Sequence, residues 1–265
     1  MERAALPDTP TPLLQAANLV KRYDSFEAVS GVTLNVTRGE IFGLLGPNGA
    51  GKTTTVNMCV GLLRPTAGSV TIAGIDLEQD PRTAKRLIGY LPDEPYLYDK
   101  LTGREFITFL AELYGTTQDL SRRRDELLRY FGLLDAADDL TAGYSHGMKQ
   151  KTALCAMLIH EPQILFLDEP TGGLDPRSAR LLKDTLRSLA DHGRGIVLST
   201  HILEIAQAIC DRIAILDHGR IIAEGSMEEL RRTAHASSGE SLEDIFLQLT
   251  AEGEQGAVAQ ALLAE

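Results

Sequence analysis

A glycine-rich octapeptide in the first quarter of the chain has the residue types that bind phosphate. It runs Gly46-Pro47-Asn48-Gly49-Ala50-Gly51-Lys52-Thr53 and satisfies the pattern G-x-x-x-x-G-K-[ST]. Its glycines allow successive backbone N–H groups to turn inward around phosphate oxygens, and a following helix adds the positive end of its dipole. Lys52 is suited to reach the β- and γ-phosphates, and the Thr53 hydroxyl is suited to coordinate Mg²⁺. These residues predict a nucleoside triphosphate site.

Two acidic residues follow an apolar run of strand length. Ile164 to Leu167 is apolar throughout, and Asp168 and Glu169 come directly after it. A buried strand delivers such side chains to the carboxyl edge of an open α/β sheet, where ligands bind. Asp168 is suited to hold Mg²⁺, and Glu169 to orient and deprotonate an attacking water. Acids at strand ends often only cap a helix, but the phosphate loop favours the catalytic interpretation.

A histidine ends another apolar run in the same way. His201 follows the strand-like segment 196–200. It is suited to donate a hydrogen bond to a γ-phosphate and to the loop that positions water. A single histidine is more often structural, but its place after the loop and the acid pair favours function. We therefore predict Lys52, Glu169 and His201 as the catalytic residues.

The spacing of apolar residues assigns these groups to alternating strands and helices. Strands are expected at Leu13–Val20, Ala28–Val36, Glu40–Leu45, Ser69–Ala73, Ile88–Leu91, Ile164–Leu167, Gly195–Ser199 and Ile213–Leu216. Helices are expected after the phosphate loop through Met58 and Leu63, and at Met227–Arg232 and Ser241–Leu249. Strands separated by helical stretches indicate a mainly parallel sheet.

The middle of the chain has a different pattern and no strand signal. Its apolar residues recur at spacings of three and four: Phe106, Phe109, Leu110, Leu113 and Tyr114. This predicts a helical subdomain at about 101–160, inserted into an α/β core. We expect a flexible leader over 1–12, one nucleotide-binding domain over 13–235, and a C-terminal helix and tail over 236–265.

Charge and hydropathy exclude several classes of protein. The 265 residues carry a formal net charge of −11, which is unfavourable for binding a phosphate backbone, so no nucleic-acid partner is expected. No window approaches the roughly 18 to 20 apolar residues of a membrane span. The N-terminus lacks the pattern of a signal peptide, which predicts a cytoplasmic protein. Cys59, Cys155 and Cys210 lack metal-ligand spacing and are expected to be reduced, packed thiols.

Further motifs narrow the family. Tyr144–Gln150, with the sequence Tyr-Ser-His-Gly-Met-Lys-Gln, resembles the signature of ATP-binding-cassette (ABC) proteins, commonly Leu-Ser-Gly-Gly-Gln. Gly172–Asp175 resembles their D-loop, and Tyr23 stands where the family keeps an adenine-stacking aromatic residue. The resemblance covers about Leu14 to Ser226. It implies the ABC cassette of the P-loop NTPases: an α/β fold with a mainly parallel core sheet, an antiparallel β subdomain and an inserted α-helical subdomain.

The resemblance also implies ATP and Mg²⁺ as ligands, and a second ATPase subunit, expected to be an identical copy. The ATP-binding residues would be Tyr23, Gly46, Pro47, Asn48, Gly49, Ala50, Gly51, Lys52, Thr53 and Thr54. Ser145, Gly147 and Asp175 would contact the nucleotide of the other subunit, since a helix N-terminus with a serine cap is suited to anions. For Tyr23 a plain packing role stays open as the alternative.

Three residues depart from the family pattern. His146 and Met148 stand where the signature commonly has glycine and glutamine; Met148 cannot make the polar contact to ribose, and the bulk of His146 is interpreted as tolerated variation. Asp93 replaces the usual glutamine of the Q-loop. A carboxylate is a stronger Mg²⁺ ligand than an amide, although this one is shorter by one methylene. We therefore expect Thr53, Asp168 and Asp93 as the metal ligands.

Within the family, the segment Leu44–Thr55, the Met-Lys-Gln of the signature and Ser241–Phe246 resemble bacterial multidrug and antibiotic exporters. In these, two ATPase chains pair with separate membrane permease subunits, which would place this chain at the inner face of the cell membrane. Two alternatives remain. An ABC ATPase that acts on DNA or ribosomes usually has two cassettes or a long coiled-coil insertion, and this chain has neither. A regulator that does not hydrolyse ATP is disfavoured by the intact catalytic residues.

Overall fold

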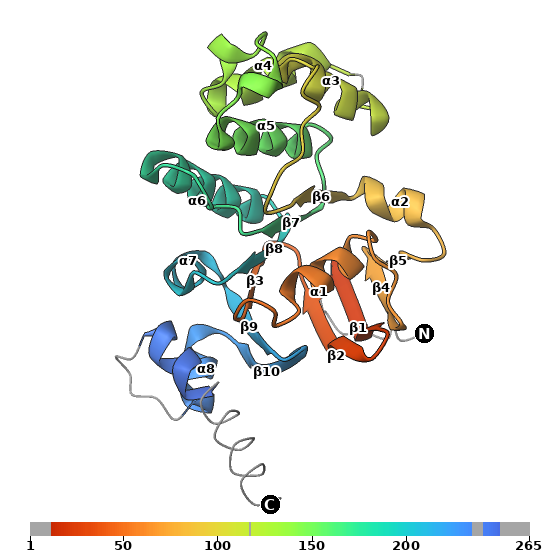
Figure 1. Ribbon diagram of the computed structural model, residues 1–265, viewed down its shortest axis with the longest axis vertical. Coiled ribbons are helices and arrows are strands. Elements are labelled where there is room, and N and C mark those ends of the chain that lie inside the picture. Colours follow the sequence, from red (N-terminus) through yellow and green to blue (C-terminus); the bar gives the residue numbers. More distant parts are fainter. Residues whose placement is uncertain (1–11, 117, 235–240, 250–265) are drawn as a thin grey trace, which may run out of the picture.

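A computed structural model of the chain describes residues 12–116, 118–234 and 241–249 (Figure 1). The expected flexible leader therefore lies outside the described residues except for Pro12, as do 236–240 and 250–265 of the expected C-terminal helix and tail. Among the residues described, no helix has the length and apolar character that a bilayer span requires.

Four strands form an antiparallel sheet from the first part of the chain. β1 (Leu14–Tyr23), β2 (Phe26–Val36), β4 (Ala67–Ile72) and β5 (Ile75–Asp76) lie in the order β2-β1-β4-β5. β1 and β2 are joined by a turn in which Asp24 has a φ of +49°, so Tyr23 and Phe26 pair directly at the tip of the hairpin. The first strand is longer than the sequence predicted, and this extension is what brings Tyr23 into the sheet.

The second sheet has six strands, and the catalytic candidates follow three of them. β3 (Ile41–Leu45), β6 (Ile88–Leu91), β7 (Ile164–Asp168), β8 (Gly195–Thr200), β9 (Arg212–Asp217) and β10 (Arg220–Gly225) lie in the order β10-β9-β3-β8-β7-β6. All neighbours are parallel except the edge strand β10. Every residue of β3, β7 and β8 is buried, which explains their unbroken apolar runs.

Alternate residues of this sheet pack against different layers. Phe42, Phe166 and Val197 share a core with the antiparallel sheet and with α1 (Lys52–Cys59), which lies between the two sheets (Figure 1). Leu165 and Leu198 face the opposite core. That core also contains α6 (Pro176–Asp191), while α7 (Leu203–Ile209) contacts the same sheet near β3 and β8. The period of two along a strand produces both cores from one sheet.

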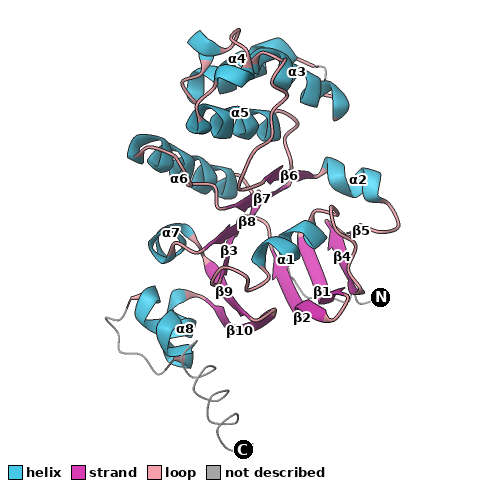
Figure 2. Cartoon of the chain, in the orientation of Figure 1, coloured by secondary structure: helices cyan, strands magenta, loops and turns pink. Residues whose placement is uncertain are grey.

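Three helices connect β6 to β7 along the chain. α3 (Gly103–Leu113), α4 (Leu120–Tyr130) and α5 (His146–Leu158), with short 3₁₀ turns at Leu134–Ala136 and Thr141–Gly143, form the layer at the top of Figure 2. A capping box between Thr102 and Glu105 starts α3. The predicted fold class is confirmed: a mainly parallel core sheet, an antiparallel β subdomain and an inserted helical part.

Short elements differ from the sequence predictions. The helix after the phosphate loop ends at Cys59 rather than continuing through Leu63, because Gly61 takes a left-handed φ of +70° and ends it. β5, α2 (Pro81–Arg86) and β10 were not predicted. β5 and α2 are short and largely polar, and β10 has exposed residues at Arg220, Ile222 and Glu224, so none of them has the unbroken apolar run of the buried strands.

The C-terminal part packs on the six-stranded sheet. α8 (Met227–Thr233) begins with a capping box between Ser226 and Glu229, close to the predicted range. A helix at 242–249 matches the predicted one, and its Leu242 and Ile245 enter a core that includes Leu45 of β3. This packing joins the C-terminal helix to the strand that precedes the phosphate loop.

Candidate nucleotide-binding site

The phosphate loop connects the buried strand β3 to α1. Two of its glycines are required by neighbouring backbone. A Cβ on Gly46 would lie 2.2 Å from the carbonyl oxygen of Leu216, and one on Gly51 would lie 2.6 Å from that of Ala28. Gly51 also has a φ of +103°, which only glycine adopts without strain. Side chains at these positions would push the loop out of its curve around the helix N-terminus.

Lys52 lies inside this curve. It is buried, and its Nζ donates to the carbonyl oxygens of Gly46, at 2.7 Å, and Pro47, at 3.1 Å. Burial lowers the pKa of the Lys52 ammonium, whereas the negative charges of Glu169 and Asp168 raise it. The loop's own carbonyls therefore hold the ammonium where a phosphate would meet it.

Thr53 and Asp168 form the part of the site that fits a metal ion. The Thr53 hydroxyl donates to Oδ2 of Asp168 at 2.8 Å, and Asp168 is 2% exposed. The other carboxylate oxygen, Oδ1, is buried with no hydrogen-bond partner among the described residues. A buried carboxylate oxygen without a partner is costly, and Mg²⁺ prefers such oxygens together with hydroxyls, water and phosphates. The donor set therefore fits Mg²⁺ together with phosphate and water, since no three His, Cys, Asp or Glu side chains of the described ranges are arranged to hold a metal ion by themselves.

Glu169 begins the loop after β7 with a φ of +46°, an uncommon value for a residue with a side chain. Its carboxylate is held from the end of the neighbouring strand β8. Oε2 accepts from the Thr200 hydroxyl at 3.0 Å, and Oε1 lies 2.8 Å from Nδ1 of His201. Both oxygens are thus bound from the end of β8, whereas Asp168 binds Thr53, so the two adjacent acids are available for different tasks.

One cleft of about 370 Å³ brings most of the predicted residues together. Its lining consists of Tyr23, Phe26, Ala28, Pro47, Asn48, Gly49, Gly51, Lys52, Thr53, Thr54, Asp93, Asp168 and Glu169. Partial burial, and then the charges of Asp168 and Glu169, raise the pKa of Asp93, while His146 opposes the shift. The cleft thus has a basic and hydroxyl-bearing floor, an acidic wall and two aromatic rings at its rim.

Comparisons with known proteins identify the family. The model of the family described as ABC transporter matches residues 29–172. This chain belongs to the ABC transporter family. It is 43% identical over 223 residues, covering 84% of this chain and 68% of the relative, to the daunorubicin/doxorubicin resistance ATP-binding protein DrrA of Streptomyces peucetius. This chain is thus an ATP-binding subunit whose hydrolysis of ATP is coupled to transport.

Other relatives agree with this assignment. The linearmycin resistance ATP-binding protein LnrL of Bacillus subtilis is 39% identical over 219 residues, covering 82% of this chain and 70% of that protein. A solved structure titled "Structure of ATP binding subunit of ABC transporter" superposes with a TM-score of 0.86 at 37% identity. That likeness covers 90% of this chain and 99% of the solved one.

The ABC signature residues lie outside the cleft. Ser145 is the N-cap of α5, and its hydroxyl accepts from the backbone N–H of Met148 at 3.3 Å. Asp175 is the N-cap of α6, where it accepts from the backbone N–H of Ser178 at 3.0 Å and from its hydroxyl at 2.5 Å. Neither Ser145, Gly147 nor Asp175 lines the cleft that contains the phosphate loop. In this ABC subunit Asp175 thus has a local capping role, in addition to any contact with a partner.

Three residues around the ABC site were missed by the sequence analysis. Phe26 is 63% exposed and lines the cleft beside Tyr23, which is 45% exposed. Thr200 binds Glu169, and the buried Gln150 donates from Nε2 to the carbonyl oxygen of Pro170 at 3.0 Å. For Phe26 a signal existed, because the turn between two strands implies that the aromatic residues flanking it are cross-strand neighbours.

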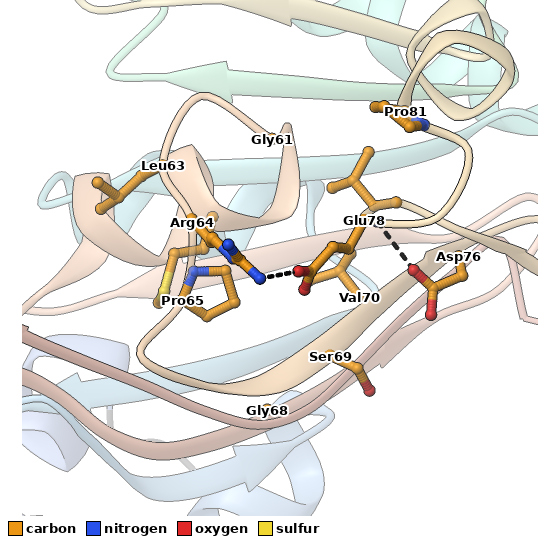
Figure 3. A pocket seen from close by; sticks show the side chains of 12 residues that line it. Gly61, Leu63, Arg64, Pro65, Gly68, Ser69, Val70, Asp76, Glu78 and Pro81 are labelled. Atoms are coloured by element: carbon orange, nitrogen blue, oxygen red, sulfur yellow. Dashed lines mark hydrogen bonds and ion pairs between the residues drawn. The ribbon is translucent and has the colours of Figure 1, made fainter.

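A second cavity, of about 240 Å³, does not suit a nucleotide (Figure 3). It lies between the end of α1 and the β4–β5 hairpin, with an apolar floor of Met58, Val70 and Leu77. Its cation, Arg64, is paired with Glu78 at the rim. A triphosphate would have to displace this ion pair and would find no glycine loop, so this cavity suits a nucleotide less well than the cleft at the phosphate loop.

Proposed function

We propose that this chain drives export by binding ATP and Mg²⁺ between two copies of itself. The observation that carries the proposal is that the predicted nucleotide-binding residues lie in two separate places on the chain. Lys52, Asp168 and Glu169 share one cleft, whereas Ser145 caps a helix that does not contribute to that cleft. A serine-capped helix N-terminus is suited to a phosphate, so the missing side of the site is supplied by the signature helix of a second copy.

The residues of one copy have separate roles in the proposed reaction. Lys52 and the loop N–H groups bind the β- and γ-phosphates, and Tyr23 stacks on adenine. Thr53 and Asp168 hold Mg²⁺, with Asp93 as a further oxygen ligand at the cleft wall. A bound Mg²⁺ would supply positive charge that offsets the negative charge of the phosphates. Glu169 accepts the proton of the attacking water, and His201 orients this carboxylate and reaches toward the γ-phosphate.

Membership of the family supports a proposal for the partners and the location. ABC ATPase subunits work with membrane permeases, and we propose separate permease subunits, a homodimer of this chain and a position at the inner face of the cell membrane. The relatives are named for resistance to daunorubicin, doxorubicin and linearmycin, which favours export of a drug-like or antibiotic compound. A net charge of −11 supports the absence of a nucleic-acid partner. The domain boundaries 13–235, with a helical subdomain at about 101–160 and a C-terminal helix and tail from 236, remain part of this proposal.

The test is to trap the closed pair. Glu169→Gln removes the base but keeps the size of the side chain, so ATP hydrolysis falls by roughly a hundredfold or more while ATP binding persists. With millimolar ATP and Mg²⁺ the variant is expected to elute as a dimer in size exclusion with light scattering, alone or with its permease. Chelation of Mg²⁺ and the double variant with Lys52→Ala serve as controls, and both should elute as monomers.

Two results would contradict the proposal. If Glu169→Gln turned over ATP at the wild-type rate, the carboxylate would not be the base. If the trapped variant bound ATP and stayed monomeric both alone and with the permease, the shared site would be wrong.

A further inference from the structure

The first residue of the signature helix contacts the D-loop of its own chain. Nε2 of His146, at the start of α5, lies 3.3 Å from the carbonyl oxygen of Gly172. With the proton on Nε2, the imidazole donates a hydrogen bond to this carbonyl. The interpretation of His146 as tolerated bulk therefore misses a specific contact, since the ring is engaged by the loop that follows Glu169.

Gly173 accommodates the ring. A Cβ at this position would lie 2.3 Å from Cδ2 of His146 and 2.9 Å from its Nε2, so the imidazole occupies the space that any other residue would fill. Gly173 also has a φ of +69°. The ring and the glycine are thus complementary in shape: with the imidazole in this position, a side chain at 173 would clash with it.

A second contact lies one helical turn further along α5. The buried Gln150, four residues after His146, donates from Nε2 to the carbonyl oxygen of Pro170 at 3.0 Å. Residues i and i+4 share one face of a helix, so both side chains hold the segment 170–173 from the same side. Two hydrogen bonds from one helix face attach this loop to α5.

The attached loop also contacts the proposed base. The backbone N–H of Gly172 donates to the carbonyl oxygen of Glu169 at 3.1 Å, closing a turn that starts at the uncommon φ of Glu169. A chain of contacts therefore runs from the helix that Ser145 caps, through His146 and Gly172, to Glu169. The two ends of this chain serve the two different nucleotides of the proposed pair.

We propose that His146 is a positioning residue that, with Gln150, holds the turn at Glu169 and couples the signature helix to the base of the same subunit. This inference rests on the proposed role of Glu169. Removal of the imidazole loosens the turn and lowers the rate of hydrolysis. Nucleotide binding by the cleft is retained, because His146 is not part of the cleft lining.

The test measures kcat and KM for ATP in three variants of the full chain. His146→Gly lowers kcat roughly fivefold, the effect of one hydrogen bond, with KM changed by less than about twofold. His146→Gln keeps an N–H donor and restores most of the rate. His192→Gln is the matched control, because His192 bonds the Ser188 carbonyl within α6, and its kcat is expected to equal that of the wild type.

A double-mutant cycle with Gly173→Ala tests the contact itself. The left-handed φ penalises alanine in both backgrounds, but the clash with the ring exists only when His146 is present. Gly173→Ala therefore lowers kcat several-fold more in the wild type than in the His146→Gly background. Circular dichroism shows whether the Gly173→Ala variants fold. If they do not, the comparison of His146→Gly with His146→Gln is the test of the proposal.

Three outcomes would overturn the inference. Additive effects in the cycle would show that the ring and Gly173 do not interact, and a rate for His146→Gln equal to that of His146→Gly would show that the donor has no role. A faster His146→Gly would show that the imidazole is only an obstacle. Glu169→Gln is assayed alongside these variants. If it kept full turnover, the proposed role of Glu169 itself would be wrong. If it were inactive and the effects of the His146 and Gly173 substitutions were additive, only the inference about His146 would be wrong.

Discussion

Nδ1 of His201 lies 2.8 Å from Oε1 of Glu169, and the Thr200 hydroxyl binds the other oxygen of the same carboxylate. Two successive residues at the end of β8 thus orient both oxygens of the acid that follows β7. The carboxylate is thereby held from β8, while Asp168 binds the Thr53 hydroxyl. This separation allows one acid to serve the metal and the other to serve water.

Replacement of His201 should therefore impair chemistry more than binding. His201→Ala removes the partner of Oε1 and is expected to lower kcat for ATP hydrolysis about a hundredfold, with nucleotide affinity changed by only a few-fold. Thr200→Val removes the second partner and should have a smaller effect in the same direction. Steady-state ATPase assays check both, and wild-type turnover in His201→Ala would contradict the assigned role.

The aromatic rim of the cleft can be tested with the nucleotide base. Tyr23→Ala should weaken ATP binding roughly tenfold, because the adenine loses its stacking surface, while Tyr23→Phe keeps the affinity. Inorganic tripolyphosphate, which has no base, should bind all three proteins alike. Phe26→Ala decides whether the neighbouring ring contributes, and titration calorimetry measures each affinity. If tripolyphosphate lost as much affinity as ATP, the ring would be structural.

Asp93 should influence the metal requirement. Asp93→Gln restores the amide usual in the family and removes one carboxylate charge from the acidic wall. The Mg²⁺ concentration for half-maximal hydrolysis is therefore expected to rise roughly tenfold. Glu94→Gln is the matched control. It removes the same charge from the next residue, and the side chain of Glu94 does not line the cleft. Unchanged Mg²⁺ dependence and unchanged stimulation by the permease in Asp93→Gln would show that Asp93 only fills space.

His160 should make stability depend on pH. Its Nε2 donates to the Ile88 carbonyl at 3.0 Å, its ring stacks on Tyr114 with centroids 3.8 Å apart, and its Nδ1 is buried without a hydrogen-bond partner in the described chain. Burial lowers the pKa of His160 below 6.5, and Arg123 adds to this against the opposing hydrogen bond to Ile88. The unfolded chain therefore binds a proton more readily than the folded one.

The direction of the pH dependence follows from the coupling between proton binding and folding. Stability is fully present above pH 6.5, the ordinary pKa, and is lost as the pH falls toward the lower pKa of the folded state. Urea unfolding at pH 5.5 and 7.5 should show a larger loss of stability for the wild type than for His160→Gln, which cannot take up the proton. Equal losses in the two proteins would contradict the prediction.

Much of the candidate site was predictable because its parts are local. The phosphate loop needs glycines, a lysine and a hydroxyl at fixed spacing, and strands buried on both faces are recognisable as apolar runs that end in polar residues. Lys52, Asp168 and His201 could therefore be selected without coordinates, and the alternation of strands and helices predicted a mainly parallel sheet. β5 escaped because two residues have no period to recognise, and β10 because exposed residues interrupt its apolar run.

The tertiary structure alone decided which of these residues touch. Thr200 meets Glu169 across 31 residues of sequence, and His146 meets Gly172 across 26. No local pattern encodes such distances, because they follow from strand register and from how one helix packs on the next loop. The sequence alone determined the chemical groups; the packing of α5 against the segment after β7 decided that a histidine in the signature became a contact of the D-loop.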